Sequence, residues 1–155
     1  EFISSSPSLC AVSDFAKIHL DRRLTWGENK ELALNQVREI VKGMNAKVEL
    51  LNYEKTSFTG LNYGMEKYYP TWKIEEDHHV IKSGVKTFSD LFNQKPKVDK
   101  WTFSTNGVTI NGKHKIPVIG FGPGNEELAH APDEKVPIEH LVKASAFYAL
   151  FCHNF

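Results

Sequence analysis

Apolar and polar residues follow one another along this chain in patterns that predict both strands and helices. From Ala16 to Leu20 they alternate, which is the period of two that indicates a half-buried strand. A second alternation runs from Lys47 to Tyr53. Between the two, apolar residues recur at helical spacing from Glu28 to Met44 and predict an amphipathic helix. Strand, helix and strand in this order correspond to half of a split βαβ, ferredoxin-like unit.

The second half of the chain predicts a different order of elements. Asp77 precedes a helical pattern from His78 to Phe92, and residues 97–103 form a strand candidate. Residues 116–121 are continuously apolar, which is typical of a strand buried on both faces of a sheet. Pro137 opens a last helical pattern that ends near Cys152. This order predicts part of a layered α/β domain.

A turn-rich, aromatic stretch separates these two regions. We interpret residues 58–76 as a crossover between a domain at residues 1–57 and a second one at 77–155. The aromatic residues of the crossover belong either to a packed surface loop or to a stacking platform for bases. The absence of basic neighbours favours the packed loop.

Composition narrows the class of partner and compartment. Lys plus Arg equals Asp plus Glu, 19 of each, so no basic excess favours a nucleic-acid partner. The longest apolar run, from Ala144 to Cys152, is too short to span a membrane. Cys10 and Cys152 form no disulfide framework, so we expect a reduced, cytoplasmic setting. The chain opens without methionine at Glu1, and we expect it to be a piece of a longer protein, unless the terminus was processed or set by expression.

The stretch from Gly120 to Glu134 is the main candidate for chemistry. A glycine-rich loop follows a predicted strand, and His130 stands shortly before a predicted helix. An imidazole in this place can bind a metal, with Asp133 and Glu134 as outer partners. Zinc needs three or four protein ligands, and the chain contains no HxxxH or CxxC pair. From spacing alone, a hydrogen-bonded loop histidine is therefore favoured over a ligand.

Two other groups of polar residues follow predicted strands. Ser104, Thr105 and Asn106 offer hydroxyl and amide groups to a substrate carbonyl or carboxylate, but Asn-Gly is also a simple turn signal. Arg22 and Arg23 offer guanidinium groups that suit a carboxylate. The alternative for the arginines is a solvated strand end, paired with Asp21 or Glu28.

Three stretches together resemble a known family. Gly120–Glu134, the strand and turn from Ile18 to Glu28, and Lys100–Gly107 resemble the C-terminal end of the di-zinc aminoacylase/carboxypeptidase peptidases. Acetylornithine deacetylase and succinyl-diaminopimelate desuccinylase belong to that family. Thr25-Trp26-Gly27 lacks the proline of the family's Pro-Gly-Glu-like turn. The sequence Trp-Thr-Phe-Ser-Thr-Asn-Gly is most similar to the hydrolases linked to selenium metabolism.

The resemblance implies an α/β fold made of two incomplete parts. Residues 77–155 would be the C-terminal part of a three-layer αβα zinc-hydrolase domain. Residues 1–57 would be half of a ferredoxin-like (βαββαβ) lid, through which the family usually forms homodimers.

The resemblance also implies roles for individual residues, although it assigns none of them to catalysis. His130 would be a zinc ligand, and Arg23 would bind a substrate carboxylate, with Arg22 as the fallback. The residues that would line the substrate pocket are Ser104, Thr105, Asn106, Gly122, Gly124 and Asn125.

The implied reaction is hydrolysis of an amide bond in an N-acyl amino acid or small peptide. Two zinc ions would serve it, with cobalt or manganese as alternatives. The family's other ligands and its general base lie upstream of the matched region, and we find none of them in these 155 residues. We therefore expect the chain to be inactive alone. The competing hypothesis is a non-enzymatic binding or dimerisation module that lacks the metal half.

Overall fold

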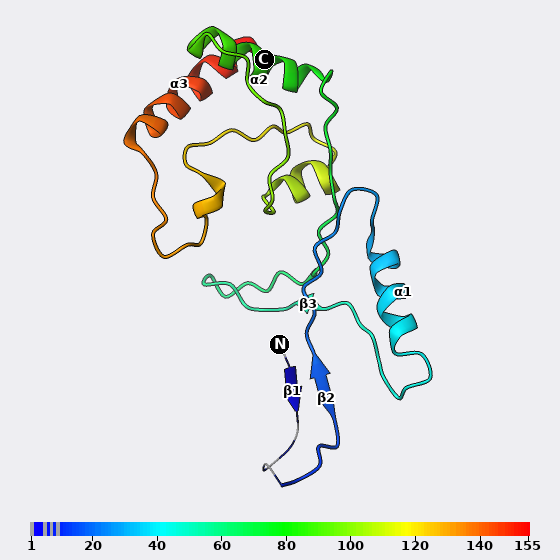
Figure 1. Ribbon diagram of the computed structural model, residues 1–155. Helices are drawn as coiled ribbons and strands as arrows, with labels where there is room; N and C mark the ends of the chain where they lie inside the picture. Colours follow the sequence, from blue (N-terminus) through cyan, green and yellow to red (C-terminus); the bar gives the residue numbers. More distant parts are fainter. Residues whose placement is uncertain (1, 5, 7, 9) are drawn as a thin grey trace. The chain divides into compact units, whose positions relative to one another are not determined.

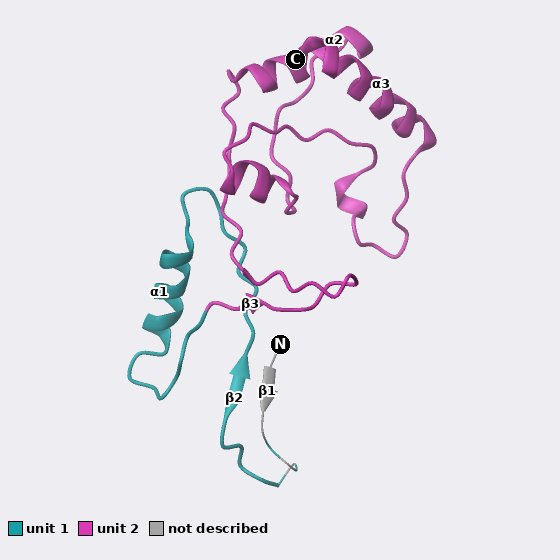
Figure 2. Cartoon of the chain, turned by 180° about the vertical axis from the view of Figure 1, so that it is seen from behind, with its two compact units in different colours: residues 1–49 teal, residues 50–155 magenta. Residues whose placement is uncertain are grey.

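A computed structural model describes all residues of the chain except 1, 5, 7 and 9 (Figure 1). The chain divides into two compact units, residues 1–49 and 50–155 (Figure 2). The expected divisions at residues 57/58 and 76/77 stay predictions. Among the described residues, no helix has both the length and the apolar character needed to cross a membrane.

The first unit contains a short antiparallel ribbon and one helix. Strand β1 (Phe2–Ser4) pairs with β2 (Ala16–Ile18), so the predicted strand is present but shorter than expected. Helix α1 spans Lys30–Ile40 within the predicted helical stretch. It begins at Asn29, whose side chain accepts a hydrogen bond from the backbone N–H of Leu32 at 2.9 Å. None of the residues of α1 is buried, and Ala33, Leu34 and Val37 are only partly covered in the described chain.

The second unit contains a hairpin, two long helices and two single-turn elements. The hairpin pairs β3 (Asn52–Tyr53) with β4 (Met65–Glu66). The remaining elements are α2 (His79–Phe92), the π-helix η1 (Val108–Lys113), the 3₁₀-helix η2 (Glu126–Leu128) and α3 (Ile138–Asn154). Both long helices were predicted from their periodicity, whereas η1 and η2 were not.

The core of the second unit lies between α2 and α3. The ring of Phe147 in α3 is 2% exposed and stacks on Phe121, with ring centroids 3.9 Å apart. Thr87 in α2 is fully buried, and its hydroxyl accepts a hydrogen bond from the side chain of Asn154 at 3.0 Å. Ile119 packs against α2 at Gly84, where an added Cβ would lie 2.6 Å from the end of its side chain. Residues 119 and 121 thus rest on the helix pair.

Three predicted strands are not formed as expected. Residues 97–103 and 116–121 contain no strand, and neither stretch is paired with another strand in the part of the chain that the structure describes. Of residues 47–53, only Asn52 and Tyr53 are in a strand, and their partner is β4. The split βαβ unit stays a prediction, because its two strands flank another strand and need not pair with each other. Periodicity reports which side chains would be buried, but a strand also needs a neighbour that accepts its backbone hydrogen bonds.

A second packing contact holds the start of η1. Gly107 is buried against the indole of Trp72, and an added Cβ would lie 2.4 Å from that ring. Its backbone is helical, with φ −54° and ψ −29°, so alanine would fit the backbone but not the space.

We predict that Gly107→Ala lowers the free energy of unfolding by about 1–3 kcal/mol, because the indole must move away from the new methyl group. Urea unfolding followed by tryptophan fluorescence measures this change. Gly64→Ala is the matched control, because nothing lies within 4 Å of its added Cβ. Equal stabilities of the two variants would contradict the steric argument.

Candidate functional site

Two segments of the second unit are predicted to bind substrate, residues 104–106 and residues 122–125. Residues next to these segments contact each other. The indole of Trp101 covers Gly120, where an added Cβ would lie 2.3 Å from the ring. The backbone N–H and the hydroxyl of Thr102 lie 3.4 and 3.5 Å from the carboxylate of Glu126. These contacts connect the residues just before Ser104–Asn106 to residues 120–126, which we call the glycine-rich loop.

Within residues 104–106, some of the hydrogen-bonding groups are already paired with the backbone of η1 and its first turn. The hydroxyl of Thr105 accepts a hydrogen bond from the N–H of Gly107 at 3.1 Å. The carbonyl of Asn106 accepts hydrogen bonds from the N–H groups of Thr109 and Ile110, each at 3.0 Å, and so starts η1. Ser104 and Asn106 have exposed side chains, which leaves them accessible to a ligand.

The glycine-rich loop is held from α3. Gly124 has φ +106°, a conformation that favours glycine, and its N–H donates a hydrogen bond to Nδ1 of His140 at 3.3 Å. Asn125 caps η2, since its side chain accepts a hydrogen bond from the N–H of Glu127 at 3.1 Å. Gly122 is exposed and has open space around it. The sequence did not single out His140, because no local pattern connects residues that far apart.

His130 occupies an unusual backbone position. The N–H of Ala131 donates to the carbonyl of Leu128 at 3.0 Å, and Ala129 between them has φ −59° and ψ 127°. His130 follows with φ +64°, so it is the third residue of a type II turn, where glycine is the usual residue. Its N–H donates to the carboxylate of Glu134 at 3.1 Å. A histidine held in this left-handed conformation carries a local cost that its turn and Glu134 must offset.

The described residues do not assemble a complete metal site around this histidine. They contain no group of three or more His, Cys, Asp or Glu side chains placed to hold one ion. Glu134, expected as an outer partner, contacts the backbone of His130. His130 is therefore an exposed imidazole outside any cluster of ligating side chains in the described chain, and a metal bound to it would need ligands from other residues.

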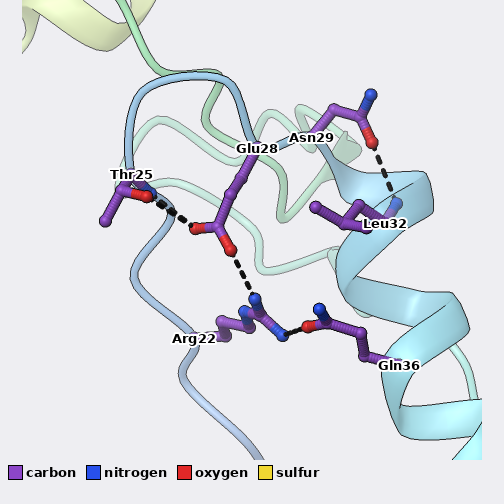
Figure 3. Close-up of polar contacts among 6 residues, drawn as sticks. All are labelled: Arg22, Thr25, Glu28, Asn29, Leu32 and Gln36. Atoms are coloured by element: carbon purple, nitrogen blue, oxygen red, sulfur yellow. Dashed lines mark hydrogen bonds and ion pairs between the residues drawn. The ribbon is translucent and has the colours of Figure 1, made fainter.

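The two adjacent arginines of the first unit have different surroundings. Arg22 forms an ion pair with Glu28 at 2.6 Å and also donates a hydrogen bond to the side chain of Gln36 (Figure 3). Arg23 lies 3.4 Å from Asp21, and its side chain is 75% exposed. Arg22 is thus engaged in the turn before α1, while the guanidinium of Arg23 is the more accessible one for a carboxylate.

Arg22 supports the turn formed by residues 25–28, just before α1. The N–H of Glu28 donates to the carbonyl of Thr25 at 3.0 Å, and Gly27 has φ +92°. The N–H of Thr25 donates in return to the Glu28 carboxylate at 2.7 Å. This hydrogen bond, followed by those from Arg22, holds the pKa of Glu28 below its ordinary value. Trp26 is the second residue of this four-residue turn, a position where proline is common in β-turns.

Comparison with known proteins decides the family. The sequence matches "Peptidase family M20/M25/M40" over residues 7–154. The chain belongs to peptidase family M20/M25/M40. It is 54% identical to the uncharacterized protein YgeY of Escherichia coli K12 over 151 residues, which are 96% of this chain and 38% of YgeY. It is 24% identical to the uncharacterized metallohydrolase MJ0457 of Methanocaldococcus jannaschii over 141 residues, 90% of this chain and 34% of that protein. No solved structure matches.

Membership of the M20/M25/M40 family confirms the resemblance found in the sequence. The chain spans well under half the length of these relatives. The roles expected for Arg23, His130 and the loop residues stay predictions, as does the particular likeness to the selenium-linked hydrolases.

We predict that His130→Gly leaves this M20-family chain as stable or raises its free energy of unfolding by about 1 kcal/mol or less, because glycine removes the left-handed strain. Thermal unfolding measures this change. His114→Gly is the control: His114 has φ −96°, so glycine there lowers stability by about 0.5–1 kcal/mol. A clear loss of stability in His130→Gly would show that the imidazole packs favourably enough to outweigh the strain.

We predict that Arg22→Gln raises the pKa of Glu28 partway toward the ordinary 4.5, because the hydrogen bond from Thr25 remains. Since folding lowers this pKa, the carboxylate contributes stability above pH 4.5 that is lost as the pH falls through the folded-state value. Titration of the Glu28 carboxyl carbon by NMR measures the shift. Arg23→Gln is the control and should leave this pKa unchanged; an equal effect of both substitutions would contradict the assignment to Arg22.

Proposed function

We propose that this chain is the C-terminal portion of a metal-dependent hydrolase that cleaves an amide bond in an N-acyl amino acid or small peptide. The family match over residues 7–154 is the observation that carries the proposal. The metallohydrolase named among the relatives supports the same class. We further propose that this portion is inactive alone, because His130 has no co-ligands among the described residues.

Zinc is the metal that we propose, with two ions in the complete protein. The donor set of the described residues does not fit such a site, since one imidazole cannot hold a catalytic zinc. The chain covers 38% of YgeY, so the remaining length of a protein of that size has room for the other ligands. In this view His130 contributes one ligand, and its left-handed turn fixes where the imidazole projects.

The other named residues would bind the substrate. Arg23 keeps an exposed guanidinium, which suits a carboxylate of an amino-acid substrate. Ser104 and Asn106 offer exposed polar side chains next to the segment that touches the glycine-rich loop. Gly122, Gly124 and Asn125 would let the backbone of that loop approach the substrate closely.

The architecture proposed for the complete protein also explains exposed apolar residues. Residues 77–155 would complete a three-layer αβα domain, with 97–103 and 116–121 as two of its strands. Trp101, Phe103 and Ile116 on these segments are 44%, 43% and 55% exposed, as expected for side chains that neighbouring strands or helices would cover.

A second candidate function is a binding or dimerisation module without hydrolase activity. Two exposed apolar side chains of α1 favour it, because Leu32 and Ile40 are 42% and 73% exposed and suit a homodimer contact through the lid. A lid dimer is also compatible with the enzyme, so dimerisation alone does not separate the two functions. The cytoplasm remains the compartment that we propose for either.

We predict that the complete gene product binds zinc and hydrolyses at least one member of a panel of N-acyl amino acids and dipeptides, while this chain alone does neither. Metal content by mass spectrometry and amine release measure the two properties. In the complete protein His130→Ala should lower activity by more than the about 10–100-fold typical of losing an outer-shell partner. His153→Ala, at the exposed end of α3, is the control.

Two results would contradict parts of this proposal. Tight, stoichiometric zinc binding or amide hydrolysis by this chain alone would show that it is not inactive by itself. A complete protein that neither binds zinc nor hydrolyses any member of the panel would favour the module.

A further inference from the structure

Two side chains of α3 form hydrogen bonds with the backbone of the glycine-rich loop at separate points. The hydroxyl of Tyr148 donates a hydrogen bond to the carbonyl of Phe121. Nδ1 of His140 accepts a hydrogen bond from the N–H of Gly124 at 3.3 Å. One contact uses a backbone acceptor and the other a backbone donor, so the segment 121–124 is held at both of its ends by one helix.

The Tyr148 end of this contact is part of the core. Phe121 stacks on Phe147 with ring centroids 3.9 Å apart, and Tyr148 meets both rings edge-on, at 6.4 and 6.0 Å. Phe147 is 2% exposed. Because the aromatic packing places the Tyr148 ring, its hydroxyl reaches the Phe121 carbonyl from a fixed position.

The His140 end lies in the first turn of α3, and its side chain is 39% exposed. For Nδ1 to accept a hydrogen bond, the neutral ring must carry its proton on Nε2. The carboxylate of Glu139 lies 4.0 Å from Nε2, on the side where that proton would be. The hydrogen bond therefore requires one tautomer of His140, and Glu139 favours the same one.

The two glycines of this segment are themselves little constrained by side-chain packing. Gly122 and Gly124 are exposed, and no atom lies within 4 Å of a Cβ added at Gly122. Gly124 has φ +106°, one of several conformations open to glycine in a free chain. The two hydrogen bonds select one of them.

We propose that His140 and Tyr148 are positioning residues that fix the backbone of residues 121–124, so that the loop presents its remaining backbone polar groups to the substrate in one orientation. The proposal rests on the proposed function, because it concerns the same loop. It assigns no contact with metal or substrate to either residue.

Amide hydrogen exchange on this chain directly tests the hydrogen bond between the Gly124 N–H and His140. His140→Leu should speed exchange at the Gly124 amide about five-fold, as expected for loss of one net hydrogen bond. His140→Asn should restore part of the protection, because its side-chain oxygen can accept. The ¹⁵N spectrum of the wild-type His140 ring should show an unprotonated Nδ1. His153→Leu, on the same helix, is the control.

Kinetics of the complete protein test the positioning role. His140→Leu and Tyr148→Phe should lower kcat/KM by about ten-fold or more while the zinc content stays unchanged, because misplaced binding groups slow the reaction without removing a ligand. His140→Asn should recover activity in parallel with Gly124 protection.

The outcomes separate the two proposals. Unchanged exchange of the Gly124 amide in His140→Leu, or a proton on Nδ1 of His140, would show that His140 does not hold the loop by this hydrogen bond. Faster exchange with unchanged kcat/KM would overturn its role in positioning. A wild-type complete protein with no activity would defeat the proposed function, while the exchange experiment would still decide whether the loop is held as described.

Discussion

The contact between Phe121 and Phe147 is the interaction on which the second unit depends. Phe147 of α3 is almost fully buried beside α2, and Phe121 belongs to the segment that leads into the glycine-rich loop. The stacked rings thus connect the helix pair to the candidate site. Ile119 against Gly84 and the Tyr148 hydroxyl on the Phe121 carbonyl reinforce the same attachment. The position of the loop follows from core packing, because the loop contributes few contacts of its own.

Two type II turns show how differently the chain treats the same geometric requirement. The turn before α1 has glycine at its left-handed position, Gly27, and the ion pair between Arg22 and Glu28 supports it. The turn after η2 has His130 there, at φ +64°. Glycine would satisfy the second turn at lower cost, so stability does not explain the histidine. An imidazole at a strained position is consistent with the metal-ligand role that we propose for His130.

The long helices could be predicted from the sequence because their determinants are local. Apolar residues repeat at helical spacing through α1, α2 and α3, and a helix forms its hydrogen bonds within its own segment. The contact of His140 with Gly124 and the turn at His130 could not be predicted, since both depend on tertiary packing and on a backbone angle that no pattern marks. The family resemblance ranks Arg23 above Arg22, but only the structure shows how the surroundings of the two side chains differ.

The strands were the hardest elements to predict for a related reason. Residues 116–121 have the apolar run of a strand buried on both faces, and in the described chain Ile119 and Phe121 of this segment pack on the helix pair. A buried strand requires neighbours on both edges as well as cover on both faces. The helix pair supplies part of that cover and no edge. The sequence pattern and the structure therefore agree if residues outside this chain supply the neighbouring strands. The proposed role of His130 as a zinc ligand leads to the same requirement independently of packing, because zinc needs three or four protein ligands.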